Sequence, residues 1–214
     1  MKWHEEVLDA DALSAATRLA PVLGGRFYLA GGTGLALRYG HRISLDLDLF
    51  SREDKLDANG RQTLLSDLKT SGKAEVLECS DRTLHLRVGR TPVSLFHYPY
   101  ALCGPTTEWR GIPVASDVDI GAMKINAIAG RGARKDFLDL YWICRKTGLE
   151  RILDAVETKF PDHADFLVSA SKALVYFEDA EQEPEPRLLR PLSWRKIKAY
   201  FESETPKVLR KRLR

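Results

Sequence analysis

Two aspartates one residue apart, Asp46 and Asp48, follow a glycine-rich segment, and this combination predicts a metal-dependent nucleotide site. Side chains two positions apart on a strand point to the same face, so both carboxylates can be directed at one point. Paired carboxylates at a strand end suit Mg²⁺, which prefers oxygen ligands and shares its sites with substrate phosphates. In this interpretation Leu45, Leu47 and Leu49 point to the opposite face, toward the core.

The glycine-rich segment before the aspartates has the composition of a phosphate-binding turn. It reads Gly31-Gly32-Thr33-Gly34 and follows an apolar run at residues 27–30 that is typical of a strand. Backbone N–H groups in such a turn, and at the N-terminus of a following helix, can bind a phosphate. An Asp-x-Asp pair can also be a solvated strand end, and Gly-Gly-Thr an ordinary tight turn. The two patterns together, at this spacing, favour the nucleotide site.

A second group of candidate residues lies on helical segments farther along the chain. Asp136 and Asp139 are three residues apart, which places them on one face of a helix. Lys124 lies between Met123 and Ile125 in an otherwise apolar helical stretch. Acidic pairs and single lysines on helices are commonly solvated, so spacing alone does not assign them a role.

Residues 31–50, GGTGLALRYGHRISLDLDLF, resemble the first motif of the AbiEii/AbiGii toxin family. That family belongs to the nucleotidyltransferase superfamily of the DNA polymerase β type. Residues 124–141, KINAIAGRGARKDFLDLY, resemble a later motif of the family, and residues 93–100 and 176–200 are similar to one of its subgroups. The resemblance therefore covers most of the chain in the right order.

The resemblance implies an NTP-dependent nucleotidyltransferase that acts as the toxin of a toxin–antitoxin or phage-defence (abortive infection) system. Its expected partners are an NTP, an RNA acceptor such as a tRNA 3′ end, and a cognate antitoxin. Its expected metal is Mg²⁺ or Mn²⁺, held by Asp46 and Asp48. The implied nucleotide-binding residues are Gly31, Gly32, Thr33, Ser44 and Lys124. The implied catalytic residues are Asp46, Asp48, Lys124, Asp136 and Asp139.

One feature departs from the pattern of the superfamily. Polymerase-β-like enzymes usually carry a third carboxylate on a neighbouring strand, where it can act as base for the attacking hydroxyl. The matching strand, residues 92–98, offers Ser94, Phe96 and His97 but no acid. His97 could accept a proton near pH 7, or Asp139 could. The alternatives are a catalytically weak protein that acts by binding RNA or an antitoxin, and an enzyme that modifies a protein.

Composition narrows the class of protein. A chain of 214 residues can form one or two domains with a proper core. No apolar run approaches the length of a membrane span, and the acidic N-terminus lacks the apolar region of a secretory signal. Three widely spaced cysteines form neither a disulfide framework nor a zinc pattern. We therefore expect a cytoplasmic protein without a membrane partner.

The C-terminal segment is basic, although the whole chain has a net charge of only +3. From Glu185 onward, ten lysines and arginines face three acidic residues. Such a segment is a candidate contact surface for nucleic acid, where the RNA acceptor would lie. It is equally typical of a solvated helix whose cations gather near its C-terminus.

The element pattern predicts an α+β fold with a boundary near residue 115. Residues 1–115 would form a nucleotidyltransferase-like domain with a small mixed sheet, and residues 116–214 a helical domain. Strands are predicted at 27–30, 43–50, 74–79, 83–88 and 93–98, with helices at 12–23 and 62–68. The glycine-rich turn is predicted to open a short helix through Leu35, Leu37 and Arg38, which ends at Gly40. In the second half, helices are predicted at 124–129, 134–145, 149–160 and 164–180, with a last helix after Ser193. Asp117 or Asp119 is expected to cap the first of these.

Overall fold

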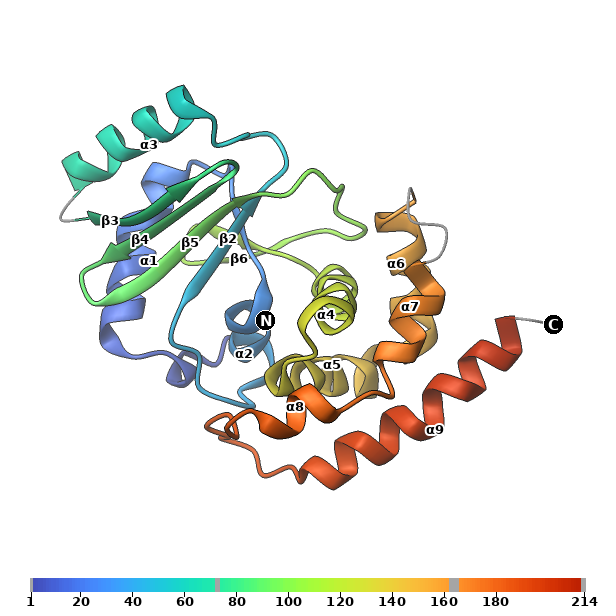
Figure 1. Cartoon of the computed structure of the whole chain (residues 1–214). Coiled ribbons are helices and arrows are strands. Elements are labelled where there is room, and N and C mark those ends of the chain that lie inside the picture. Colours follow the sequence, from blue (N-terminus) through green and yellow to red (C-terminus); the bar gives the residue numbers. More distant parts are fainter. Residues whose placement is uncertain (1, 72–73, 162–165, 213–214) are drawn as a thin grey trace. The chain divides into compact units, whose positions relative to one another are not determined.

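The computed structural model describes residues 2–71, 74–161 and 166–212. The chain forms two compact units. The first comprises Met1–Ala101 and Pro105–Ala115, and the second Leu102–Gly104 and Ser116–Arg214. The first contains a mixed sheet with helices, and the described part of the second contains helices without strands (Figure 1). The expected α+β fold class is therefore confirmed.

The first unit is built on a seven-stranded mixed sheet with the order β3-β4-β5-β2-β1-β7-β6 (Figure 1). Strand β2 runs parallel to β5, and β1 parallel to β7, while all other neighbours are antiparallel. The strands are β1 (Tyr28–Leu29), β2 (Leu47–Ser51), β3 (Ala74–Ser80), β4 (Thr83–Val88), β5 (Thr91–His97), β6 (Thr107–Trp109) and β7 (Ile112–Val114). The strands predicted at 74–79, 83–88 and 93–98 are thus present, whereas β6 and β7 were not predicted.

One face of this sheet is covered by α1 (Ala10–Leu23) and α3 (Ala58–Ser71). Alternate side chains of the central strands join the leucines of these helices in one buried cluster: Leu47, Leu49, Leu84, Leu86, Val93 and Leu95. Successive side chains of a strand point to opposite faces. The residues between these, Asp48 among them, therefore point to the other face of the sheet, which we call the open face.

Helix α2 (Gly31–Tyr39) follows β1 without an intervening loop and ends where Gly40 adopts a left-handed conformation, with φ of 58°. The predicted strand from residue 43 was too long, because β2 begins only at Leu47. Before it, the N–H of Ser44 donates to the carbonyl of Val7 and not to a neighbouring strand. Leu45 is 66% exposed, so its predicted place in the core was wrong.

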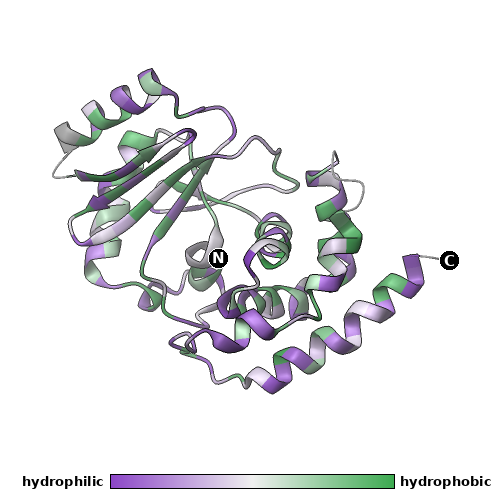
Figure 2. Ribbon diagram, in the orientation of Figure 1, coloured by the Kyte–Doolittle hydropathy of each residue, from purple (hydrophilic) through white to green (hydrophobic). Residues whose placement is uncertain are grey.

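The second unit consists of α4 to α9, packed around an aromatic core. The helices are α4 (Asp117–Arg131), α5 (Arg134–Thr147), α6 (Leu149–Lys159), α7 (Phe166–Ala173), α8 (Glu178–Gln182) and α9 (Trp194–Arg212). Phe137 of α5 lies with ring centroids 5.2 Å from Phe177, 5.9 Å from Trp194 and 5.8 Å from Phe201. The alternation of hydrophobic and hydrophilic residues along α9 is visible in Figure 2.

Two details of the second unit differ from the sequence predictions. The helix predicted over 164–180 is broken, since α7 ends at Ala173 and α8 begins at Glu178. The chain turns between them and brings Phe177 against Phe137, and the predicted start at residue 164 lies outside the described residues. The cap of α4 is Ser116, whose hydroxyl accepts from the N–H of Asp119. In the described chain, no helix combines the length and apolarity that crossing a bilayer requires.

Candidate nucleotide site

The carboxylate of Asp48 lies against the first residue of α2. A Cβ built on Gly31 would be 3.1 Å from Oδ2 of Asp48, and Gly31 has a φ of +62°, which L side chains rarely adopt. The N–H of Ala30, the residue before the helix, donates to the carbonyl of Asp48 at 3.1 Å. Only glycine satisfies both the backbone conformation and the close approach at this position. The fold therefore joins a helix N-terminus to a carboxylate on the open face.

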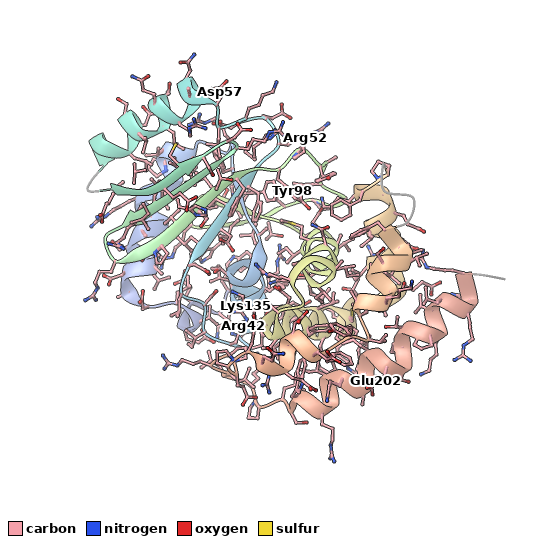
Figure 3. The ribbon with its side chains drawn as sticks, viewed as in Figure 1. Arg42, Arg52, Asp57, Tyr98, Lys135 and Glu202 are labelled. Carbon is pink, nitrogen blue, oxygen red and sulfur yellow. The ribbon has the colours of Figure 1, made fainter. Side chains whose placement is uncertain are left out.

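A guanidinium group packs on the second glycine of the same turn. A Cβ on Gly32 would overlap Nη2 of Arg42, at 2.0 Å. Arg42 lies on the loop between α2 and β2 (Figure 3), is 6% exposed, and donates from Nη1 to the carbonyl of Ile43 at 3.0 Å. The positive end of the helix dipole and this cation both favour an anion at the start of α2.

Asp46 is positioned by two buried hydroxyl groups. Thr33, in the first turn of α2, lies with Oγ1 2.7 Å from Oγ of Ser44 and 2.5 Å from the carbonyl oxygen of Asp46. Thr33 and Ser44 are 1% and 3% exposed. Their hydroxyls are thus engaged with each other and with the chain at Asp46. We infer that these two residues hold Asp46 in place. Their contact with the nucleotide remains a prediction.

Asp46 and Asp48 provide a set of hard oxygen donors. Asp46 directly precedes β2, and Asp48 is its second residue. Among the described residues, no group of three or more His, Cys, Asp or Glu side chains could hold a metal ion. Two carboxylates fit a Mg²⁺ ion that takes its other ligands from water and substrate phosphates. The metal assignment therefore remains a prediction that suits this donor set.

Strand β5, the nearest neighbour of β2 on one side, places Ser94 next to Asp48 in register. His97 is the register partner of Ser51, so it falls on the sheet face opposite Asp48. The pairing thus argues against His97 as the base that the sequence analysis considered. It also confirms that β5 offers no acidic side chain beside the carboxylate pair, since Ser94 and Phe96 occupy those positions.

The other predicted site residues form a buried cluster within the second unit. Nζ of Lys124 lies 2.7 Å from Oδ1 of Asp136 and 2.8 Å from Oδ2 of Asp139. Arg131 donates from Nε to Oδ2 of Asp136 at 2.8 Å. Both aspartates are fully buried, and Lys124 is 5% exposed. The cluster links α4 to α5, and its part in catalysis remains a prediction from the resemblance.

The charges of this cluster are matched. Burial of the Asp136 carboxyl by itself raises its pKa, but the Lys124 ammonium and the Arg131 guanidinium outweigh burial. The pKa of Asp136 therefore lies below its ordinary value, and the group is ionised at neutral pH. Two acids and two bases at these distances satisfy one another, which is the condition for a buried ion pair to be tolerated.

A second buried ion pair was not predicted. Asp119, expected as a helix cap, is fully buried and accepts from Nζ of Lys159 at 2.8 Å. Its two carboxylate oxygens also accept from the N–H groups of Cys103 and Gly104, at 2.7 and 3.1 Å. This carboxylate therefore fixes the short segment Leu102–Gly104 within the second unit. An acid close to a helix start is a common cap, so the sequence could not distinguish this role.

Most cations at the end of the basic segment are paired with acids. Lys211 and Arg212 contact acidic residues of α6, and Lys207 pairs with Glu204 on its own helix. In the part of α9 that the structure describes, Arg195 and Lys196 are exposed and have no acidic partner. Arg214 lies outside the described residues.

Comparisons with known sequences find a matching family model and a relative of this chain. A family model described as nucleotidyl transferase AbiEii toxin, type IV toxin–antitoxin system, matches residues 13–110 and 97–213. An uncharacterized protein of Aquifex aeolicus is 37% identical over 188 residues, which are 83% of this chain and 89% of that protein.

Solved structures share the fold. MenT4, a nucleotidyltransferase toxin from Mycobacterium tuberculosis, is 18% identical with a TM-score of 0.64, over 93% of this chain and 84% of that chain. JHP933 from Helicobacter pylori is 17% identical with a TM-score of 0.53, over 97% and 91% of the two chains. The antibiotic-resistance factor ANT(2″)-Ia is 15% identical with a TM-score of 0.54, over 72% and 95%. The family-model match over residues 13–110 and 97–213 shows that this chain belongs to the AbiEii family of nucleotidyl transferase toxins.

Proposed function

We propose that this protein transfers a nucleotidyl group from an NTP to a hydroxyl group at an RNA end, with Mg²⁺ at Asp46 and Asp48. One observation carries the proposal: the carboxylate of Asp48 is held against Gly31, the first residue of α2. A phosphate-binding helix N-terminus and a carboxylate pair are thereby joined in one rigid turn. That combination suits a triphosphate that arrives with its cation.

The residues of the first unit supply binding and orientation. N–H groups in the first turn of α2 have no carbonyl of their own helix to donate to, so they can donate to the triphosphate. The guanidinium of Arg42 lies beside the same turn and adds positive charge. When bound, Mg²⁺ would neutralise phosphate charge and polarise the α-phosphorus. The acceptor hydroxyl attacks in line with the departing pyrophosphate, whose charge the helix N-terminus helps to offset.

The basic C-terminal segment supports RNA as the acceptor, but fewer of its cations are available to phosphates than the sequence suggested. Lys211 and Arg212, near the end of α9, are paired with Glu150, Asp154 and Glu157, and Arg210 donates to the carbonyl of Pro206. The exposed Arg195 and Lys196, at the start of α9, remain available to phosphates. We therefore place the RNA contact in the second unit near these two residues.

The proposal includes a toxin role in the cytoplasm, with a cognate antitoxin as partner. Membership of the AbiEii family supports it. A gene next to this one that encodes a DNA-binding antitoxin, and whose product relieves growth arrest on coexpression, is the expected finding. Growth arrest that no neighbouring gene relieves would contradict this part of the proposal.

The function is tested by incubating the protein with MgCl₂, an equal mixture of four α-³²P-labelled NTPs, and total cellular RNA. The expected result is label attached to RNA, lost when EDTA is present and in Asp48→Asn. Label on protein would instead identify the protein-modifying alternative. Binding of RNA without any transfer of label would identify the catalytically weak alternative.

A further inference from the structure

We propose that Ser94 and His85 form the proton-accepting pair of the transfer reaction, in place of the carboxylate that β5 lacks. This inference rests on the proposed function. An attacking hydroxyl must lose its proton as its oxygen bonds to phosphorus, and a positioned side chain accelerates that loss. The pairing of β2, β5 and β4 places a hydroxyl one strand from Asp48 and an imidazole two strands from it, on the same face of the sheet.

The two residues lie in a row that crosses the sheet. Asp48 of β2 is the register partner of Ser94 of β5. Ser94 is in turn the register partner of His85 of β4. On the far side of β4, His85 is the register partner of Glu78 of β3. Register partners share a face, and neighbouring strands are about 4.8 Å apart. Ser94 is therefore one strand from Asp48, and His85 is two strands away on the same open face.

The imidazole is oriented toward the hydroxyl. Nδ1 of His85 lies 2.9 Å from Oγ of Ser94, within hydrogen-bond distance. The imidazole ring of His85 also packs edge-to-face against the ring of Phe96, with the two centroids 5.7 Å apart and an interplanar angle of 81°. Phe96 and Ser94 are alternate residues of β5, so one strand fixes both contacts of the histidine. Hydrogen bond and ring packing together limit the imidazole to one orientation.

The step balances as a relay. The acceptor oxygen forms a bond to the α-phosphorus while the bond from phosphorus to the pyrophosphate oxygen breaks. The acceptor proton passes to Oγ of Ser94, and the proton of Ser94 passes to Nδ1 of His85, whose Nε2 carries the other hydrogen. The resulting imidazolium is stabilised by negative charge near it, as in a hydroxyl–imidazole–carboxylate arrangement. Glu78, next in the row, supplies that charge.

The charged neighbours of His85 are few in the described chain. Glu78 faces it from β3, and Arg87 lies two positions along β4. Arg87 pairs with Glu75 at 3.1 Å, so its charge is offset locally. On β5 the neighbouring residue is Ser94, and Asp48 lies beyond it on β2. The relay requires a neutral imidazole, because only an unprotonated Nδ1 can accept the proton of Ser94.

The test uses the full chain with MgCl₂, labelled NTPs and total cellular RNA. His85→Gln and Ser94→Ala are each expected to lower kcat by about 100-fold, the usual loss when a general base is removed, with little change in NTP binding. His97→Gln is the matched control, because His97 lies on the same strand as Ser94 but on the other face. In His85→Ala, added imidazole should restore part of the rate.

The outcomes separate this inference from the proposed function. Transfer that Asp48→Asn abolishes but His85→Gln and Ser94→Ala retain would overturn the relay alone. Label bound covalently to Ser94 would also overturn it, since Ser94 would then be the nucleophile. A wild-type protein that transfers nothing to RNA would overturn both.

Discussion

The main chain at Gly31 lies directly against the carboxylate of Asp48. Position 31 combines a left-handed backbone with a space that a Cβ would fill at 3.1 Å from Oδ2 of Asp48. The start of α2 and the second residue of β2 are therefore fixed relative to each other. Strain and crowding at this residue can be separated by mutation, because Gly24 and Gly25 share the left-handed backbone but have nothing within 4 Å of their Cβ positions.

Gly31→Ala is expected to abolish nucleotide transfer while leaving the fold intact. The new Cβ would displace the Asp48 carboxylate, and the left-handed conformation would cost about 1–2 kcal/mol of stability. Gly25→Ala is the control, because Gly25 has a φ of +74° and nothing lies within 4 Å of its Cβ position. Thermal melts and transfer assays on both variants check this. Equal transfer activity of the two variants would show that the close approach of Gly31 to Asp48 is not needed for nucleotide transfer.

Lys124→Met is expected to destabilise the second unit by about 3–5 kcal/mol, because it leaves buried carboxylates without their main counter-charge. Urea denaturation measures the change. Lys146→Met is the control, since Lys146 pairs with Asp117 at 2.9 Å with its side chain 60% exposed. Such an exposed pair contributes about 0–1 kcal/mol. If Lys124→Met is as mild as the control, the cluster does not stabilise the second unit, and a role of its lysine toward the substrate is favoured.

The pH dependence of stability follows from Asp136. Its pKa is lowered in the folded protein, so its stabilising contribution is present above the ordinary range of an aspartate and is lost as pH falls through the lowered value. In Lys124→Met, burial would raise that pKa, and the variant should gain stability as the carboxyl takes up a proton. The difference in unfolding free energy between wild type and variant should therefore narrow from pH 7 to pH 4. A constant difference would contradict the assignment.

Helices and strands could be predicted where their hydrophobic periodicity extends over many residues. Residues 12–23 and 134–145 have helical periodicity, and the strands of the β3–β4–β5 meander alternate over six or seven residues. Strands β6 and β7 have three residues each, too few for alternation to show. Leu45 was assigned to the core because it continues an apolar alternation, but β2 begins only at Leu47, and the N–H of Ser44 donates to the carbonyl of Val7.

The sequence indicated which residues form the candidate site, but not which of them contact one another. Asp46 and Asp48 were visible from their spacing beside the glycines. The pairing of Thr33 with Ser44 and of Lys124 with Asp139 depends on contacts between separate elements. His85 had no sequence pattern that marked it, because its neighbour Ser94 lies across a hairpin, and strand register places the two in one row with Asp48.

RNA binding should depend on Arg195 and Lys196 more than on the cations near the C-terminus. Arg195→Gln with Lys196→Gln is expected to weaken RNA affinity and to reduce its log–log salt slope by up to about 0.7 units for each lost phosphate contact. Lys207→Gln with Lys211→Gln removes the same charge from residues that already pair with acids. Filter binding at several salt concentrations compares the two. Equal slopes would move the RNA contact elsewhere.

Asp48→Asn is the sharpest test of whether Asp48 serves Mg²⁺-dependent nucleotidyl transfer. The asparagine keeps the shape of the side chain but removes the negative charge, so the fold and its melting temperature should be retained. Transfer of label from α-³²P NTPs to total RNA, measured against Mg²⁺ concentration, should fall by about 100-fold or more, as when a group that stabilises transition-state charge is removed. Transfer by Asp48→Asn at the wild-type rate would contradict the account.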